Sequence, residues 1–163
     1  MQERHDKEQY FFDQETVDRV ADLLGPFERV CALCAPTVGS ELEERGANVV
    51  TLDVDERFRT LKNFRRWDLY RPERIADQFD VIFCGPPFFR VSLSQLFDAI
   101  RVLTHYDFSQ RIVVSYLVRR RNAVLGTFVR FDLRPTGLHP GYRTVRGCAR
   151  NDIEFFANFD WQD

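Results

Sequence analysis

A short apolar run that stops at two prolines constrains the fold of this chain more than any other stretch. Residues 80–84 read Asp-Val-Ile-Phe-Cys, and Gly85, Pro86, Pro87 and Phe88 follow directly. The apolar run predicts a buried strand. The prolines predict a rigid, non-helical turn, because proline fixes φ and donates no hydrogen bond to a neighbouring strand. Such a turn holds Phe88 in one place, at the kind of strand end where α/β proteins bind ligands.

The length of 163 residues predicts a single domain, 1–163, that is large enough to bury a core. Hydrophobic residues make up 44% of the chain, which excludes a disordered or fibrous protein. No apolar run reaches transmembrane length, and residues 1–12 are too charged for a secretory signal. We therefore expect a cytoplasmic protein without a membrane partner, disordered over residues 1–8.

Two of the four cysteines, Cys31 and Cys34, form a C-x-x-C pattern. A zinc site is disfavoured because there is no second pair and no nearby histidine, so we expect no metal. Redox chemistry is disfavoured because the pattern falls within a predicted strand instead of at a helix start. Small buried apolar side chains are the better interpretation.

Helical and extended patterns alternate along the chain. Helical spacing of apolar residues, with Asp13 and a Ser92-x-x-Gln95 capping box as helix starts, predicts helices over 13–24, 40–45, 92–103 and 119–125, with a helical turn at 58–61. Apolar runs predict strands over 30–35, 48–54, 64–68, 79–84, 111–117, 128–133 and 152–159. This order predicts an α/β fold with one doubly wound, mostly parallel, seven-stranded Rossmann-like sheet that ends in an antiparallel strand pair.

The first half of this pattern is typical of nucleotide-binding α/β units. A strand over 30–35, a tight turn, a helix and a second strand are followed by acidic residues, Asp53 and Asp55. In such units the acid accepts hydrogen bonds from ribose hydroxyls. The usual glycine fingerprint is missing, so the prediction depends on spacing alone.

Five stretches in this order resemble class I S-adenosylmethionine-dependent methyltransferases that methylate amines. More narrowly, the chain is similar to the family first described as N6-adenine methyltransferases, whose eukaryotic members methylate a lysine of elongation factor 1-alpha. The resemblance covers roughly residues 9–160. The stretches that carry it are residues 9–16 (Gln-Tyr-Phe-Phe-x-x-Glu-Thr), 34–38, 53–58, 79–88 and 151–160.

The resemblance implies the cofactor S-adenosyl-L-methionine and a site for its methionine end. Residues 9–12, with Phe11 and Phe12 among them, would fold over that end, although an N-terminal aromatic clamp that only packs is the alternative. Backbone amides of the turn at Ala35, Pro36 and Thr37 would bind the cofactor carboxylate in place of a glycine-rich loop.

The resemblance also implies a site for the adenosine end of the cofactor. Asp53 would bind the ribose hydroxyls, and Asp55 would share that role or cap the following turn. Asp68, at the end of the third strand, would accept a hydrogen bond from the adenine amino group or cap a helix or turn instead.

The chemistry would belong to Gly85, Pro86, Pro87 and Phe88. In the family the first position is Asp or Asn, whose side-chain oxygen orients the target nitrogen together with the carbonyl of the first proline, while the aromatic ring packs against the target. Gly85 has no side-chain acceptor. Three alternatives follow: the Pro86 carbonyl acts without it, another side chain supplies the acceptor, or the protein binds the cofactor as a catalytically silent module or scaffold.

Arginine is concentrated in residues 111–150, which contain nine Arg and one acidic residue, Asp132. Arginine suits phosphate and carboxylate partners, so this region predicts a surface for a protein or RNA substrate near the turn at Gly85. A chain of this length leaves no room for a target-recognition domain, which disfavours duplex DNA. By analogy with the family, protein lysine is slightly favoured over adenine N6 of RNA as the methyl acceptor.

Overall fold

Seven strands form one sheet in the order β3-β2-β1-β4-β5-β7-β6 in the computed structural model, which describes residues 1–4, 10–87, 90–144 and 152–161. The strands are β1 (Val30–Leu33), β2 (Val49–Asp53), β3 (Phe64–Arg66), β4 (Val81–Cys84), β5 (Arg111–Leu117), β6 (Arg134–Pro135) and β7 (Ile153–Ala157). Strands β1 to β5 pair in parallel, whereas β7 pairs antiparallel with both β5 and β6. The predicted fold class, including the antiparallel end of the sheet, is confirmed.

The order of the strands places a topological switch point between β1 and β4. From β1 the chain builds outward through β2 to β3, and it then returns to the other side of β1 with β4. The loops that follow β1 and β4 therefore leave the same edge of the sheet in opposite directions. A crevice at the carboxyl ends of the strands is expected at this point.

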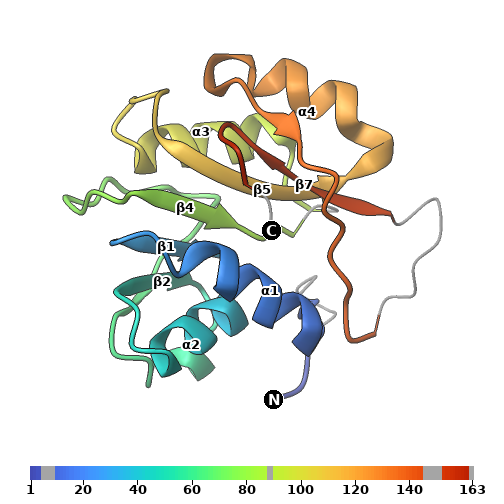
Figure 1. The fold of residues 1–163 in the computed structure, drawn as a ribbon. Helices are drawn as coiled ribbons and strands as arrows, with labels where there is room; N and C mark the ends of the chain where they lie inside the picture. Colours follow the sequence, from blue (N-terminus) through green and yellow to red (C-terminus); the bar gives the residue numbers. More distant parts are fainter. Residues whose placement is uncertain (5–9, 88–89, 145–151, 162–163) are drawn as a thin grey trace.

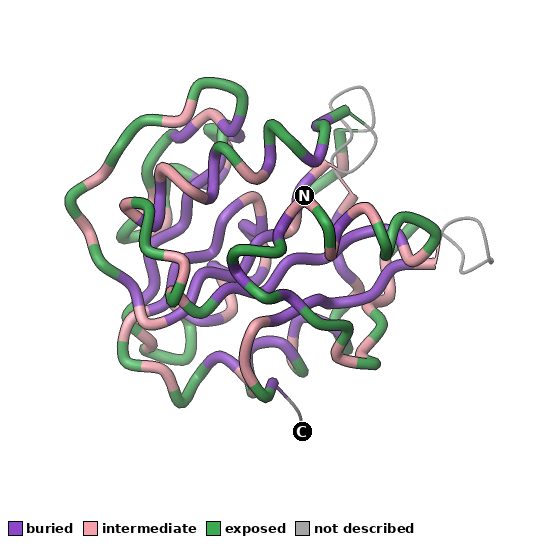
Figure 2. The backbone as a smooth tube through the Cα atoms, turned by 90° about the horizontal axis from the view of Figure 1, so that it is seen from above, coloured by how far each residue is buried: buried purple, intermediate pink, exposed green. Residues whose placement is uncertain are grey.

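Helices cover both faces of the sheet (Figure 1). Helices α1 (Gln14–Leu24) and α2 (Pro36–Glu44) pack on one face, and α3 (Leu93–Leu103) and α4 (Arg121–Thr127) pack on the other. The strands serve both layers because alternate side chains point to opposite faces: Val30 and Ala32 join the core under α1 and α2, while Cys31 and Leu33 join the core under α3. Figure 2 shows the resulting run of buried backbone through the middle of the molecule.

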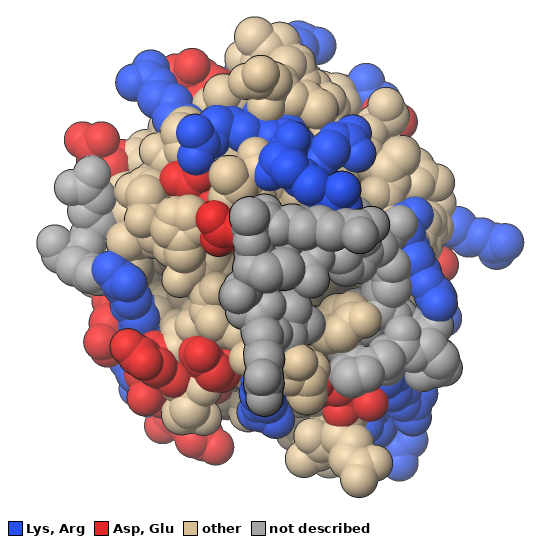
Figure 3. Space-filling view, turned by 90° about the vertical axis from the view of Figure 1, so that its right-hand side faces the viewer, with Lys and Arg blue, Asp and Glu red and all other residues tan. Residues whose placement is uncertain are grey.

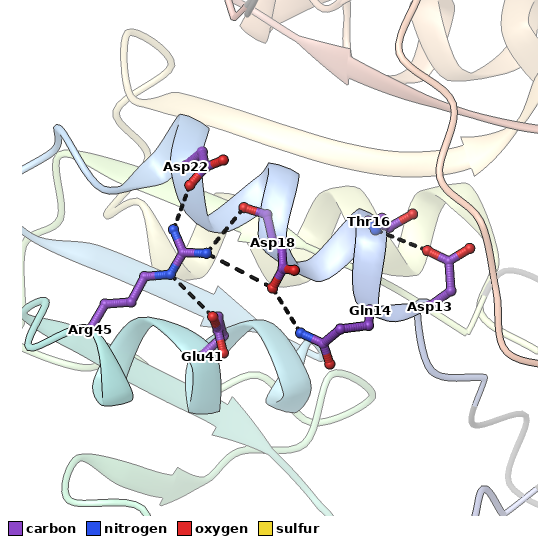
Figure 4. Close-up of polar contacts among 7 residues, drawn as sticks. All are labelled: Asp13, Gln14, Thr16, Asp18, Asp22, Glu41 and Arg45. Carbon is purple, nitrogen blue, oxygen red and sulfur yellow. Dashed lines mark hydrogen bonds and ion pairs between the residues drawn. The ribbon is translucent and has the colours of Figure 1, made fainter.

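Arg45, which follows α2, ties the two helices of one face together (Figure 4). Its guanidinium donates to Glu41 of its own helix at 3.1 Å and to Asp22 of α1 at 2.6 Å. At the start of α1, Asp13 accepts a hydrogen bond from the Thr16 backbone N–H at 2.9 Å, as its predicted capping role requires. The capping box of Ser92 and Gln95 on α3 is also confirmed.

Helix α2 begins four residues earlier than the predicted start at residue 40. Pro36 and Gly39 are turn residues by composition, but here they have helical roles. Pro36 occupies the first turn, where a missing N–H costs nothing. Gly39 lets the helix lie against β2, because a Cβ at this position would be 2.1 Å from the Thr51 hydroxyl oxygen.

The predicted strand over 128–133 is wrong. Phe128 ends α4, and Val129–Phe131 form a 3-10 turn, η4, before the short strand β6. Phe128, Phe131 and Leu133 are buried, and the first two, which lie three residues apart, pack around Phe97. That spacing belongs to a helical turn, although the apolar residues between 128 and 133 also fit the alternation of a strand.

No helix among the described residues is both long and apolar enough to cross a membrane. Within the same residues, no group of three His, Cys, Asp or Glu side chains is arranged to hold a metal ion. Burial raises the pKa of the Cys31 and Cys34 thiols well above the ordinary value. Both thiols are therefore protonated at neutral pH.

Candidate functional site

A cavity opens at the carboxyl edge of β1, β2 and β4, at the topological switch point. Its empty volume is about 830 Å³, including open solvent at its mouth. The cavity brings together ten of the predicted site residues: Phe11, Phe12, Ala35, Pro36, Thr37, Asp53, Asp55, Gly85, Pro86 and Pro87.

Asp53 ends β2 and presents a buried carboxylate to the cavity, with 8% of the residue exposed. One carboxylate oxygen accepts a hydrogen bond from the Asp55 backbone N–H at 2.8 Å. Burial raises the pKa of Asp53 from 3.8 to about 6, and this hydrogen bond only partly opposes the shift. A buried carboxylate of this kind gains from ligand hydroxyl groups that donate to it.

Asp55 is also buried, but its carboxylate already has partners. It caps the 3-10 turn η2 (Glu56–Phe58) by accepting from the Arg57 backbone N–H at 3.1 Å. Its second oxygen pairs with the Arg57 guanidinium at 2.8 Å. Asp55 therefore lines the cavity and also caps the following turn, which is the alternative role that was predicted for it.

The turn between β1 and α2 presents backbone groups to the cavity. Cys34 adopts a left-handed conformation with φ of 54°, and Ala35 is the N-cap of α2 without a side-chain hydrogen bond. The N–H groups in the first turn of a helix lack intrahelical partners, so they are donors for an anionic group. This turn has the donors that a carboxylate requires.

Gly85 follows β4 in close contact with the turn after β1. Its N–H donates to the Leu33 carbonyl at 3.0 Å. A Cβ at this position would lie 3.2 Å from the Cys34 carbonyl oxygen and 3.6 Å from the Phe12 ring. The missing side chain therefore leaves a space that is bordered by one backbone acceptor and one aromatic ring.

Phe11 and Phe12 line the cavity and are also part of the packing around it. The Phe11 ring meets Phe58 edge-on at 6.1 Å between centroids. The Phe12 ring packs on Tyr142 at 5.1 Å and edge-on against Phe83 at 6.1 Å. The two rings therefore pack against other aromatic side chains, as the alternative prediction stated, and they also face the cavity.

Tyr142 reaches the cavity from the loop between β6 and β7 and pairs with Phe12 through an isolated β-bridge. Burial raises the pKa of its phenol, and the nearby Ser115 hydroxyl opposes the shift only in part. The preceding residue fixes the loop to the start of α1: the Gly141 N–H donates to the Thr16 hydroxyl at 2.8 Å, and its carbonyl accepts from the Asp13 N–H at 2.9 Å.

Two predicted residues are not among those lining the cavity. Asp68 is turned to its own loop, where its carboxylate accepts from the Tyr70 backbone N–H at 2.9 Å. Its proposed contact with adenine stays a prediction. Phe88 lies outside the described residues.

Sequence reasoning did not place four lining residues at the site: Arg4, Cys34, Val54 and Tyr142. Val54 could have been predicted, because an apolar residue between two acids at a strand end has no core to join. The exposed fraction of Val54 is 45%. Arg4 and Tyr142 come from the N-terminal segment and a long loop, whose tertiary position no local pattern reveals.

The arginine-rich region is divided between opposite edges of the sheet. Arg119 and Arg120 follow β5 and Arg143 neighbours Phe11, so these three lie at the edge that contains the cavity. Arg111 begins β5, and Arg134 pairs with Ala157 at the end of the antiparallel strand β7, which places both at the other edge. Only part of the region can therefore act beside Gly85. Arg146 and Arg150 lie outside the described residues.

The comparisons with known proteins agree with this geometry. Residues 3–161 match the model of a family described as "Probable N6-adenine methyltransferase". No curated protein sequence matches the chain.

Several solved structures have a similar fold at low identity. A TehB-like SAM-dependent methyltransferase from Corynebacterium glutamicum is 17% identical, with a TM-score of 0.60 over 89% of this chain and 88% of that one. The E. cuniculi Mtq2–Trm112 structure, of a complex responsible for methylation of the eRF1 termination factor, is 16% identical, with a TM-score of 0.58 over 91% and 96%. The magnesium protoporphyrin IX methyltransferase ChlM from Synechocystis, with bound SAM, is 16% identical, with a TM-score of 0.57 over 88% and 77%.

These likenesses concern the fold, whereas the family match extends over almost the whole sequence. The cavity also fits S-adenosylmethionine, because it offers a buried carboxylate and unpaired helix N–H groups within one space. The chain therefore belongs to the family of probable N6-adenine methyltransferases, and it is a class I methyltransferase that depends on S-adenosylmethionine.

Proposed function

We propose that the protein methylates an amine, and that this amine is the side chain of a protein lysine in preference to adenine N6 of RNA. One observation carries the proposal: a single cavity contains Asp53 at the end of β2 and the Gly85-Pro86-Pro87 turn at the end of β4. The first is suited to hold the cofactor, and the second to face the acceptor. When bound, the cofactor supplies an electrophilic methyl group.

Different residues around the cavity bind different parts of the cofactor. Asp53 accepts hydrogen bonds from the ribose hydroxyls, and the N–H groups at the start of α2 bind the carboxylate. Val54, exposed between the two acids, offers an apolar contact to the adenine ring. Asp55 supports this arrangement by holding Arg57 and the turn η2 in place.

Gly85 favours lysine over adenine as the acceptor. The lone pair of the adenine amino group is delocalised into the ring, so adenine depends strongly on acceptors that orient its nitrogen. Loss of one such contact costs on the order of 1 to 3 kcal/mol. A neutral lysine amine has a localised lone pair and needs less help, so the Pro86 carbonyl suffices to orient it.

The apolar wall of the cavity helps a lysine react. An ordinary lysine is protonated at pH 7 and has no free lone pair. Phe12, Tyr142 and Pro86 surround the acceptor side of the cavity with apolar surface, which disfavours the ammonium form and lowers the pKa of an entering lysine. A carboxylate at position 85 would oppose this effect by stabilising the positive charge.

The experiment uses a cofactor labelled in its methyl group, offered with lysine peptides and with adenine-containing single-stranded RNA. Label in the peptide lysine is the expected result. Label in the RNA alone would contradict the choice of acceptor. Absence of cofactor binding in calorimetry at millimolar concentration would contradict the proposal as a whole.

Gly85 also favours a second candidate, a catalytically silent protein that binds the cofactor or serves as a scaffold. Gly85→Asp separates the two. A wild-type protein that binds cofactor without turnover, and that gains turnover with Gly85→Asp, would establish the silent alternative. Sustained turnover by the wild-type protein would remove it.

A further inference from the structure

Among the exposed arginines at the edge of the sheet that contains the cavity, three follow the neighbouring strands β4 and β5. Arg90 closes the turn after β4, where its N–H donates to the Pro87 carbonyl at 3.1 Å. Arg119 and Arg120 belong to the 3-10 turn η3 (Val118–Arg120), which follows β5 directly. Strands β4 and β5 are parallel neighbours, so both turns leave the same edge side by side. We call Arg90, Arg119 and Arg120 the arginine rim.

The arginine rim forms no ion pair within the described part of the chain: none of its three guanidinium groups has an acidic partner there. The adjacent Arg121, in contrast, is paired with the buried Glu154 at 2.7 Å. Figure 3 shows basic side chains gathered in a band across the upper part of this face, with acidic side chains below and to one side. An uncompensated group of arginines beside a cavity attracts an anionic partner.

The overall charge of the molecule favours an acidic protein segment over RNA. The chain has a net charge of -2 and a sequence pI of about 5.9, whereas domains that bind nucleic acid through charge are typically strongly basic. A polyanion extending beyond the arginine rim would meet the acidic remainder of the surface. A short carboxylate-bearing segment needs only the rim, and each guanidinium can bind a carboxylate through two hydrogen bonds.

We infer that the arginine rim binds Asp and Glu side chains that flank the target lysine, so that the substrate is a lysine in an acidic protein segment. The inference rests on the proposed function, because it takes the lysine to enter the cavity at Gly85. The rim then adds affinity and selects the sequence around the lysine, while the cavity residues act on the lysine itself.

The test measures fluorescence anisotropy of labelled peptides without any methyl transfer. One 15-residue peptide contains a single lysine flanked by Asp and Glu, and a second contains Asn and Gln at the same positions. We expect the wild-type protein to bind the acidic peptide about tenfold more tightly than the neutral one, and Arg119→Ala/Arg120→Ala to lose that difference. The affinity for the acidic peptide should also fall as salt is raised.

The matched control is Arg111→Ala/Arg134→Ala, which removes two exposed arginines from the opposite edge of the sheet. It changes the net charge equally and should leave the affinity for the acidic peptide within about twofold. Equal losses in the two double variants would overturn the inference, because they would report net charge alone. Equal binding of the acidic and neutral peptides would overturn it too.

A single-stranded RNA of matched length is the remaining probe. RNA that binds more tightly than the acidic peptide, and that depends on Arg119 and Arg120, would overturn the choice of partner. Methyl transfer is then measured separately. If the neutral peptide is methylated and variants of the arginine rim do not change this, the inference is overturned and the proposed function stands. If the acidic peptide binds through the arginine rim but its lysine is not methylated, the proposed function is overturned and the rim stands as a docking surface.

Discussion

At the end of β2 the cavity holds a buried carboxylate, whereas at the end of β4 it holds a residue without a side chain. The Asp53 position keeps its polar group although burial raises the pKa of the carboxyl to about 6. The Gly85 position depends on its neighbours instead, with the Cys34 carbonyl and the Phe12 ring bordering the empty space. Under the proposed function, this difference means that cofactor binding and acceptor orientation rest on separate groups, so substitutions should affect them separately.

The largest expected effect is on cofactor affinity. Asp53→Ala removes the carboxylate that accepts from the ribose hydroxyls, and two such hydrogen bonds to a charged group correspond to about 3 kcal/mol or about a 100-fold loss of affinity. Gly85→Ala, on the acceptor side of the same cavity, should leave the affinity within about threefold. Isothermal calorimetry with S-adenosylmethionine measures both. Similar losses of cofactor affinity in the two variants would contradict the separation, since Asp53 and Gly85 would then act as one unit.

The second expected effect is on stability and follows from the raised pKa of Asp53. Its folded-state pKa of about 6 lies above the unfolded value near 3.8, so the folded protein binds more protons than the unfolded chain between these values. The free energy of unfolding therefore falls as the pH rises from about 4 to about 6, by up to about 3 kcal/mol. Above pH 6 the whole cost of the buried charge is present.

Asp53→Asn removes that cost and keeps an oxygen that can accept from the Asp55 N–H. We expect it to raise the free energy of unfolding at pH 7 by about 1 to 3 kcal/mol and to flatten its pH dependence between 4 and 6. Urea denaturation at pH 7 and at pH 4.5 measures both. An Asp53→Asn protein that is less stable than wild type at pH 7 would show that the carboxylate serves the fold as well as the cofactor.

The carboxyl edge of the first strands was predictable because its signals are local. Apolar runs that end in acids or prolines identified β1, β2 and β4, and the binding of ligands at the carboxyl ends of strands indicated Asp53 and the turn at Gly85 as candidates for a site. The turn after β1 was predicted as a cofactor contact. That it is the first turn of α2 was missed, because Pro36 and Gly39 are common both in turns and at helix starts that pack closely on a strand. Composition cannot distinguish a turn from a helix start that packs closely on a strand.

Other features depend on tertiary contacts that no local pattern contains. The spacing of Phe128 and Phe131 fits a helical turn, whereas Val129, Phe131 and Leu133 alternate as in a strand, and the packing of the two phenylalanines on Phe97 decides between them. The arginines of residues 111–150 are close in sequence, but the antiparallel strand β7 and the return of the chain through α4 send them to opposite edges. Tyr142 enters the site only because its loop docks on α1.

The smallest expected effect concerns that docking and tests the acceptor side alone. A Cβ at Gly141 would lie 2.0 Å from a carboxylate oxygen of Asp13, which caps α1. Gly141→Ala must displace either the cap or the loop, at a cost of about 1 to 2 kcal/mol in the free energy of unfolding. Because Tyr142 and Phe12 move with this contact, methyl transfer should fall more than cofactor affinity.

The matched control for Gly141→Ala is Gly126→Ala, in α4, where an added Cβ meets no atom within 4 Å. Alanine should stabilise that helix by about 0.5 to 1 kcal/mol and leave methyl transfer unchanged. Thermal unfolding, calorimetry and the peptide assay compare the two variants. If Gly141→Ala weakened cofactor binding as much as methyl transfer, Tyr142 and Phe12 would belong to the cofactor side, and the boundary between the two sides would have to be moved toward Gly85.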